Sequence, residues 1–157
     1  MSVLFSEGGR AEFEALLTRY PDREAVVLPA LHLAQREFGY VSDDAIVYIA
    51  GLLGTSPAVI EGVATFYTMY NRKPLGKYHV QVCRNLSCSL MGAEALIGYI
   101  SRKLGIRPGE TTADGKFSLS EVECLGSCGT APVMQVNDDY HENLTERAID
   151  AILDALP

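Results

Sequence analysis

The chain contains four cysteines, and they form two pairs that each follow a strand-like run of residues. Cys83 and Cys88 come at the end of "YHVQVCRNLSC", and Cys124 and Cys128 at the end of "FSLSEVECLGSC". Residues 89–123 separate the two pairs. We expect all four thiols in loops at strand ends and none on a core face. This placement indicates that the four thiols share one role, so the fold has to bring the two pairs together.

Four interpretations of these cysteines are open. Two disulfides are possible by composition, but the compartment expected for this chain disfavours them. A thioredoxin-type redox pair has the spacing C-x-x-C, whereas the spacings here are C-x4-C and C-x3-C. Free structural thiols are a third interpretation, although the placement of all four at strand ends argues against it. The fourth interpretation is a metal site built from four thiolates.

The cysteine spacing leaves two metals open for such a site. Structural zinc favours C-x2-C but accepts spacings of up to four residues. A [2Fe-2S] cluster also takes four thiolates, and it needs loops that bring backbone N–H groups close to sulfur. The small residues of "CLGSC", followed by Gly129, permit that approach. The residues therefore favour iron–sulfur and keep zinc as the alternative.

The composition indicates a globular protein with a core. With 157 residues, 48% of them apolar, the chain can form one ordinary domain or a small domain with a helical appendage. The apolar run "AIVYIAGLL" is too short to span a bilayer. The first ten residues lack the pattern of a secretion signal, so we expect a cytoplasmic protein. A net charge of −7 with scattered basic residues excludes nucleic acid as the partner.

Residues 10 to about 70 have helical periodicity and predict a domain of four helices, 1–72. The first helix contains Phe13, Leu16, Leu17 and Tyr20 on one face. The second runs from near residue 23 to Gly39, and Pro29 marks either its start or a kink. The third runs from an N-cap at residue 42 to near residue 54, and the fourth begins with Ser56 and Pro57.

After the turn-rich segment "NRKPLGK" the periodicity changes, and residues 73–157 predict a small α/β domain. A strand over 78–83 is followed by the helix "GAEALIGYISRKLG" and by a second strand over 117–122. A short strand over 132–136, a hairpin turn at "NDDY" and a helix from Thr145 to Leu156 complete it. The predicted order is β-α-β-β-α, with a parallel first crossover.

The segment "DGKFSLSEVECLGSCGTAP" resembles the signature of the small [2Fe-2S] subunit, the E-type subunit, of NADH:quinone oxidoreductase, or respiratory complex I. The signature reads D-x2-F-[ST]-x5-C-L-G-x-C-x2-[GA]-P. Further segments, "LPALHLAQREFGYVSDDA", "GVATFYTMY" and "PLGKYHVQVCRNLSC", also resemble the family, so the similarity extends from about Tyr20 to Leu144. The matching signature residues are Asp114, Phe117, Ser118, Cys124, Leu125, Gly126, Cys128, Ala131 and Pro132.

The resemblance implies a fold, a cofactor and a partner. The fold is an N-terminal helical bundle followed by a thioredoxin-like [2Fe-2S] ferredoxin domain. Cys83 and Cys88 would bind one iron of the cluster, and Cys124 and Cys128 the other. The implied partners are the F-type flavoprotein subunit, which binds FMN and NADH, and the rest of the peripheral arm of complex I.

The resemblance also implies a function, which is the exchange of single electrons between the cluster and FMN. Hydride chemistry takes place on the partner, and the absence of a G-x-G-x-x-G motif after a strand agrees with this. We expect an enzyme subunit without catalytic residues of its own, which joins the cytoplasmic side of the inner membrane only through its complex. Alternative hosts are the diaphorases of NAD-linked hydrogenases and formate dehydrogenases. A zinc-stabilised interaction module and a free ferredoxin shuttle are weaker alternatives.

Several other residues lead to lesser expectations. His32, His79 and His141 are not expected to be ligands. The aromatic group Phe66, Tyr67 and Tyr70 is interpreted as a partner interface. Ser87, Ser89 and Ser127 flank the cysteines and have hydroxyls that could donate to sulfur. The isomer of the Ala131–Pro132 peptide bond is left open.

Overall fold

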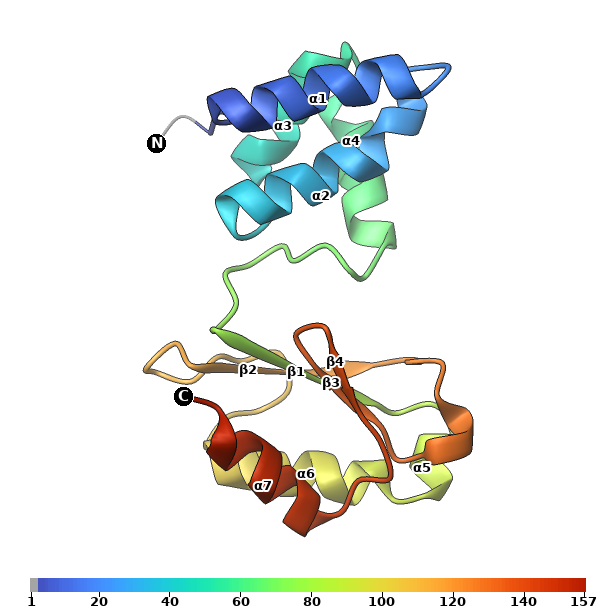
Figure 1. Ribbon diagram of the computed structural model, residues 1–157, viewed down its shortest axis with the longest axis vertical. Helices are drawn as coiled ribbons and strands as arrows, with labels where there is room; N and C mark the ends of the chain where they lie inside the picture. Colours follow the sequence, from blue (N-terminus) through green and yellow to red (C-terminus); the bar gives the residue numbers. More distant parts are fainter. Residues whose placement is uncertain (1–2) are drawn as a thin grey trace. The chain divides into compact units, whose positions relative to one another are not determined.

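A computed structural model describes residues 3–157 of the chain. The chain divides into two compact units, one that ends at Pro74 and one that begins at Leu75 (Figure 1). The first unit is helical and the second contains a sheet with helices. This confirms the expected fold class, a helical bundle followed by an α/β domain. The domain boundary after residue 72 stays a prediction.

The helical unit consists of α1 (Glu7–Arg19), α2 (Val27–Phe38), α3 (Asp43–Leu53) and α4 (Pro57–Phe66), with a short 3-10 turn, Glu24–Val26, before α2. The predicted serine caps are confirmed, because Ser42 Oγ accepts the N–H of Ala45 and Ser56 Oγ that of Ala58. Helix α1 begins at Glu7, earlier than the predicted residue 10, and Ser6 is its N-cap. Because α2 begins at Val27, Pro29 lies in its first turn, where its missing N–H costs no helical hydrogen bond.

The core of the helical unit contains residues from all four helices, among them Phe13, Leu31, Ile49 and Ile60. It also takes up Tyr70, whose side chain is buried and whose hydroxyl donates to the carbonyl of Leu28 at 2.9 Å. The interpretation of Tyr70 as an interface residue is therefore wrong, because its ring fills the core. Phe66 is 76% exposed and Tyr67 is partly exposed, so the interface hypothesis for these two stays a prediction.

The second unit is built on a four-stranded sheet in the order β2-β1-β3-β4. The strands are β1 (Tyr78–Cys83), β2 (Phe117–Val122), β3 (Met134–Val136) and β4 (Asp139–His141). Strand β1 pairs in parallel with β2 and antiparallel with β3, and β3 pairs antiparallel with β4. The parallel first crossover is confirmed. Strand β4 lies where the sequence predicted only a turn, and β3 begins two residues later than predicted.

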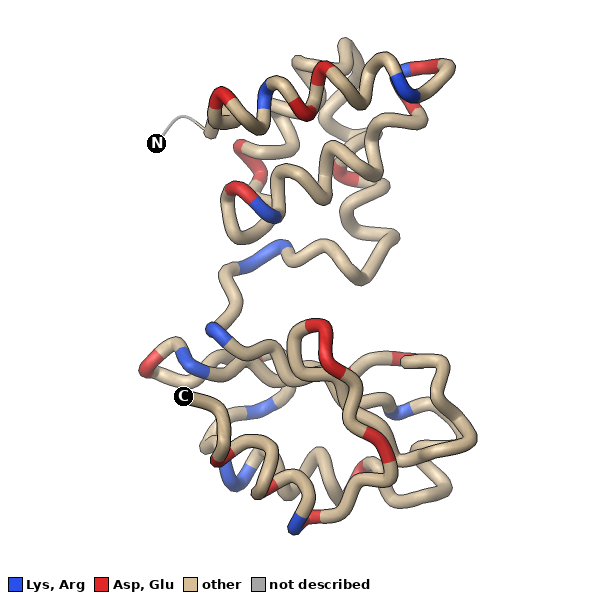
Figure 2. Tube along the Cα trace, viewed as in Figure 1, with Lys and Arg blue, Asp and Glu red and all other residues tan. Residues whose placement is uncertain are grey.

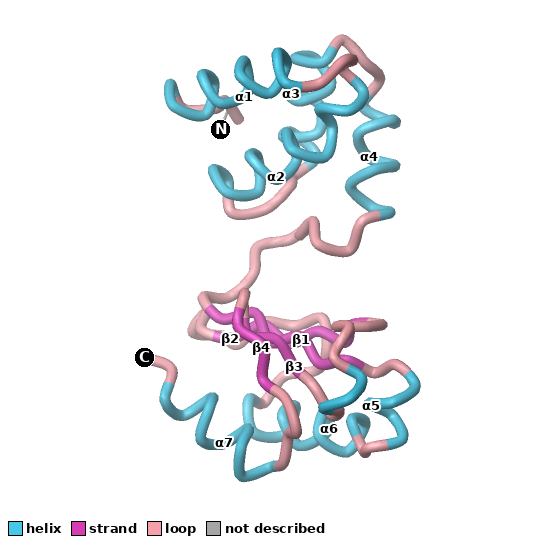
Figure 3. The backbone as a smooth tube through the Cα atoms, turned by 45° about the vertical axis from the view of Figure 1, so that its right-hand side comes forward, coloured by secondary structure: helices cyan, strands magenta, loops and turns pink. Residues whose placement is uncertain are grey.

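The helices of this unit are α5 (Leu86–Leu90), α6 (Ala93–Leu104) and α7 (Glu146–Ala155), and a 3-10 turn, η2, covers Cys128–Thr130. Figures 1 and 3 show α6 and α7 on one face of the sheet. Val80 and Leu119 of the sheet and Ile100 and Ile149 of the helices are fully buried in one core. When apolar and polar residues alternate along a strand, its apolar face packs against the core. The predicted alternation in β1 matches this burial.

The surface charges are mixed in both units. Figure 2 shows lysines and arginines dispersed among acidic residues and not gathered into one stripe. Among the helices of residues 3–157, none is long and apolar enough to cross a membrane.

Candidate metal centre

The register of the sheet places the first cysteine beside the start of the second cysteine loop. Cys83, the last residue of β1, pairs with Val122, the last residue of β2. Its backbone N–H donates to the carbonyl of Val133 at 3.1 Å. Because the carboxyl ends of parallel strands meet at one edge of a sheet, the loop that follows Val122 and carries Cys124 begins next to Cys83.

The first cysteine pair lies inside the protein, which corrects the expectation that no cysteine faces a core. Cys83 and Cys88 are only 4% and 3% exposed. They form a small apolar cluster with Ala93, Ala131 and Val133. Cys88 lies on helix α5, which begins where the side chain of Asn85 accepts the N–H of Leu86 at 2.6 Å. A helix of five residues has too little periodicity to be read from the sequence.

The second cysteine pair lies in the loop after β2, as expected, and both its residues are exposed. Gly126 adopts a left-handed conformation with φ 77°, which glycine reaches without steric cost. Its N–H donates to Cys124 Sγ at 3.3 Å. Cys128 begins the turn η2, which contacts helix α5. The Ala131–Pro132 peptide bond that follows is cis.

The thiol of Cys88 lies close enough to two other cysteines for them to affect its pKa. Burial raises the pKa of the Cys88 thiol, and a hydrogen bond with Cys83 and the nearby Cys128 raise that pKa further. Cys83 Sγ lies 3.8 Å from the carbonyl oxygen of Glu123, the residue before Cys124. All four cysteines are free thiols. Within residues 3–157, no three or more His, Cys, Asp or Glu side chains form a compact group that could hold a metal ion.

The chemistry of the residues nevertheless suits a four-thiolate group. Sulfur ligands from two adjacent loops are what iron–sulfur clusters and structural zinc both take. The Gly126 N–H is directed at a cysteine sulfur, which is the kind of donor that tunes an iron–sulfur centre. The apolar cluster around Cys83 and Cys88 keeps water from one side of the site.

Two residues of this region were missed by the sequence analysis. Glu142 accepts hydrogen bonds from the hydroxyls of Ser127 and Thr130, and Tyr140 donates to the carbonyl of Leu125 at 2.9 Å. The hypothesis that Ser127 donates to sulfur therefore does not describe this structure, because its hydroxyl is directed at Glu142. The segment "DYHEN" has no motif or periodicity that could have identified these contacts.

A surface groove lies beside helix α5 and is lined partly by residues that adjoin Cys83 and Cys88 in the sequence. Its volume is about 670 Å³. Next to it, three apolar side chains of the α5 region, Leu86, Leu90 and Met91, are between 62% and 79% exposed. Residues that line the groove are Arg84, Asn85, Leu86, Ser89, Glu94, Ile97, Glu121 and Glu123.

Two of the three histidines have ring contacts outside the cysteine segments. The ring of His32 lies 4.9 Å from that of Tyr70 in the helical unit. His79 is half-buried on β1, with Nε2 at 2.8 Å from Ser120 Oγ of the neighbouring strand. Burial lowers the pKa of His79, because the charged imidazolium loses solvation.

The lowered pKa of His79 predicts a pH dependence of stability. The unfolded chain binds the proton more tightly than the folded chain, so stability decreases as the pH falls below about 6.5. We expect the melting temperature of His79→Gln to change less than that of the wild type between about pH 7 and pH 5. Thermal unfolding at several pH values measures this, with His32→Gln as the control. Equal pH dependence in His79→Gln and the wild type would contradict the prediction.

Comparison of this chain with known proteins identifies its family. Residues 13–157 match the family of thioredoxin-like [2Fe-2S] ferredoxins. An E-type subunit of the NADH-quinone oxidoreductase of Rhizobium meliloti is 49% identical over 146 residues, which are 93% of this chain and 87% of that protein. The NADH-quinone oxidoreductase subunit 2 of Thermus thermophilus is also 49% identical, over 91% of this chain and 81% of that protein.

A solved structure supports the fold independently. The crystal structure of an air-oxidised NAD+-reducing [NiFe]-hydrogenase superposes with a TM-score of 0.72 and 24% identity, and the match covers 83% of this chain. It covers only 22% of that hydrogenase chain, so the likeness concerns the fold alone. The resemblance found in the sequence is confirmed, and the cofactor that this family implies is a [2Fe-2S] cluster. The chain belongs to the thioredoxin-like [2Fe-2S] ferredoxin family, together with the E-type subunits of NADH-quinone oxidoreductases.

Proposed function

We propose that this chain is an electron-transfer subunit of an NADH:quinone oxidoreductase. In this proposal Cys83 and Cys88 bind one iron of a [2Fe-2S] cluster, and Cys124 and Cys128 bind the other. The cluster exchanges single electrons with FMN on an NADH-binding flavoprotein subunit. The observation that carries the proposal is the parallel register of β1 and β2, because it brings the two cysteine pairs to one edge of the sheet.

The residues of this chain would bind the cluster and set its surroundings. When bound, a [2Fe-2S] cluster supplies one-electron redox chemistry. The buried thiols of Cys83 and Cys88, which share an apolar cluster with Ala131 and Val133, would bind one iron. The exposed loop with Cys124 offers a backbone N–H to sulfur. Burial on one side and a hydrogen bond on the other are two of the means by which a protein sets a reduction potential.

The proposed partner is the flavoprotein subunit, with the rest of the peripheral arm. Exposed apolar groups on a protein surface mark interaction sites. Leu86, Leu90 and Met91 form such a group beside Cys88, where a short path between cluster and flavin would run. In this proposal the chain reaches the cytoplasmic side of the membrane only through its partner subunits. Residues 1–72 form a helical docking domain, and residues 73–157 bind the cluster.

Two experiments test the proposal. The purified chain, prepared without oxygen, is expected to contain about two irons and two sulfides and to give an EPR signal only after reduction by dithionite. NADH is then expected to produce the same signal when the flavoprotein subunit is present, and no signal from the chain alone. The second result follows because hydride transfer requires the FMN and NADH sites of the partner.

Other outcomes of these experiments favour the alternatives. Stoichiometric zinc in a colourless, EPR-silent chain contradicts the cluster and supports an interaction module. Reduction by a hydrogenase diaphorase, but not by the flavoprotein of an NADH:quinone oxidoreductase, assigns the chain to the other host. Reduction by NADH alone contradicts the proposed division of labour between the subunits.

A further inference from the structure

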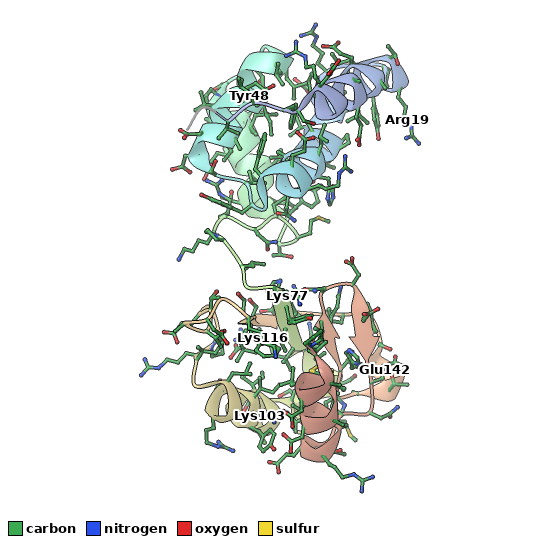
Figure 4. The ribbon with its side chains drawn as sticks, turned by 60° about the vertical axis from the view of Figure 1, so that its left-hand side comes forward. Arg19, Tyr48, Lys77, Lys103, Lys116 and Glu142 are labelled. Atoms are coloured by element: carbon green, nitrogen blue, oxygen red, sulfur yellow. The ribbon has the colours of Figure 1, made fainter. Side chains whose placement is uncertain are left out.

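Residues 140–143 make several hydrogen bonds to the loop that carries the second cysteine pair. Tyr140 of β4 donates its hydroxyl to the carbonyl of Leu125, which follows Cys124, at 2.9 Å. The backbone N–H of Asn143 donates to the carbonyl of Thr130 at 2.7 Å. Glu142 lies between these two contacts, on the segment that leaves β4 (Figure 4).

The Glu142 carboxylate holds both ends of the turn η2 that contains Cys128. Its Oε1 atom accepts the hydroxyl of Ser127, which precedes Cys128, and that of Thr130 at 2.6 Å. Each hydroxyl has a single proton to donate. When Glu142 is ionised, its carboxylate can accept both protons at once, which ties Ser127 to Thr130 across the turn. The two hydroxyl oxygens lie 2.9 Å apart, and Thr130 Oγ1 also lies 3.1 Å from the carbonyl oxygen of Ser127. The side chain therefore fixes the backbone on either side of Cys128.

The charge of Glu142 is not balanced by a cation. The hydrogen bonds from Ser127 and Thr130 lower the pKa of this carboxyl, so it is ionised at neutral pH. Among residues 3–157, no lysine, arginine or histidine forms an ion pair with it. The acidic residues before the loop differ in this respect, because Glu121 and Glu123 both pair with Arg84, at 3.0 and 3.3 Å.

We propose that Glu142 is a positioning residue for the second cysteine pair, and that its unbalanced negative charge lowers the reduction potential of the group bound there. The inference rests on the proposed function, since it requires a redox-active group on Cys124 and Cys128. Reduction adds one electron to that group, and a nearby negative charge opposes the addition. Glu142 thus has two separable effects, one on the geometry of the loop and one on the potential.

Substitutions at Glu142 separate these two effects. Glu142→Gln keeps an oxygen that accepts both hydroxyls but removes the charge. We expect it to retain the cluster. At the same applied potential, the ratio of reduced to oxidised chain should be roughly threefold higher than in the wild type, and a tenfold change in this ratio corresponds to 59 mV for one electron. Glu142→Asp keeps the charge and should stay near the wild-type potential. Glu146→Gln makes the same charge change on an exposed glutamate at the start of α7, outside the cysteine loop, and serves as the matched control.

The measurement is a redox titration of the whole reconstituted 157-residue chain, monitored by EPR at two salt concentrations. The shift in Glu142→Gln should shrink at high salt, because the carboxylate is exposed and salt screens it. An unchanged reduction potential in Glu142→Gln, or an equal shift in Glu146→Gln, contradicts the proposed effect of the Glu142 charge on the reduction potential. If the wild type binds no [2Fe-2S] cluster, the proposed function itself fails, and the two failures are thereby distinguished.

The effect on geometry is tested in the cluster-free chain. Glu142→Ala removes the acceptor of both hydroxyls, so we expect faster hydrogen exchange at the amide of Asn143, which bonds to Thr130. The amide of Val82, in the central strand β1, should exchange as in the wild type. Unchanged exchange at Asn143 in Glu142→Ala overturns the positioning role, whatever the result of the redox titration.

Discussion

Replacement of Cys88 by alanine is expected to abolish the iron–sulfur signal of the purified chain. The thiol is buried between Cys83 and Ala131, and no other cysteine is available to replace it, since the chain has only four. If Cys88 is a ligand, as proposed, its removal would leave only three thiolates for the cluster. We expect at least a tenfold loss of cluster per chain, because a [2Fe-2S] cluster takes four thiolates.

The measurement is the iron and sulfide content together with the EPR amplitude after reduction. Ser101→Ala is the matched control, because it removes one polar atom from a helix residue, on α6, that lies in neither cysteine segment. Circular dichroism of both variants separates loss of the cluster from loss of the fold. A Cys88→Ala chain that keeps its full complement of iron and sulfide would remove Cys88 from the ligand set.

Replacement of Leu119 by alanine is expected to destabilise the second unit by about 2–5 kcal/mol. Leu119 is fully buried on β2, opposite Val80 of the central strand. Its side chain belongs to the core that includes Ile100 of α6 and Ile149 of α7. Truncation removes apolar contacts and leaves a cavity that close-packed neighbours fill only in part.

Urea unfolding of the cluster-free chain, followed by far-ultraviolet circular dichroism, measures this change. Leu90→Ala is the control, because that side chain is 79% exposed, and we expect it to change the free energy of unfolding by less than about 0.5 kcal/mol. Equal midpoints for Leu119→Ala and Leu90→Ala would mean that the core of the sheet does not determine the stability of this unit.

The predicted helices agree best with the structure where local signals are strong. Ser42 and Ser56 cap helices in the structure as the sequence suggests, and Gly39 and Gly54 end two of them in the left-handed conformation. These signals act within one turn of helix, so they do not depend on distant parts of the chain. The alternation of apolar and polar residues over 78–82 predicts β1, because this signal is also local.

The elements that were missed are those that distant contacts stabilise. Strand β4 has three residues and exists through its pairing with β3. Helix α5 has five residues, and besides its cap at Asn85 it contacts the distant turn η2 of the second cysteine loop. Tyr70 is polar enough to suggest a surface position, and only the arrangement of the helices shows that its ring is buried. Short elements have too little propensity of their own to be predicted.

The sequence by itself determined the chemistry of this protein: four thiols in two spaced pairs, two types of domain and the family to which the chain belongs. The tertiary structure decided how that chemistry is arranged, which includes the burial of Cys83 and Cys88 and the clamp of Glu142 on the turn around Cys128. The physical reason is the range of the interactions. Ligand type and helix caps are encoded in neighbouring residues, whereas Glu142 meets Ser127 and Thr130 only because β3 and β4 return the chain to the cysteine loop.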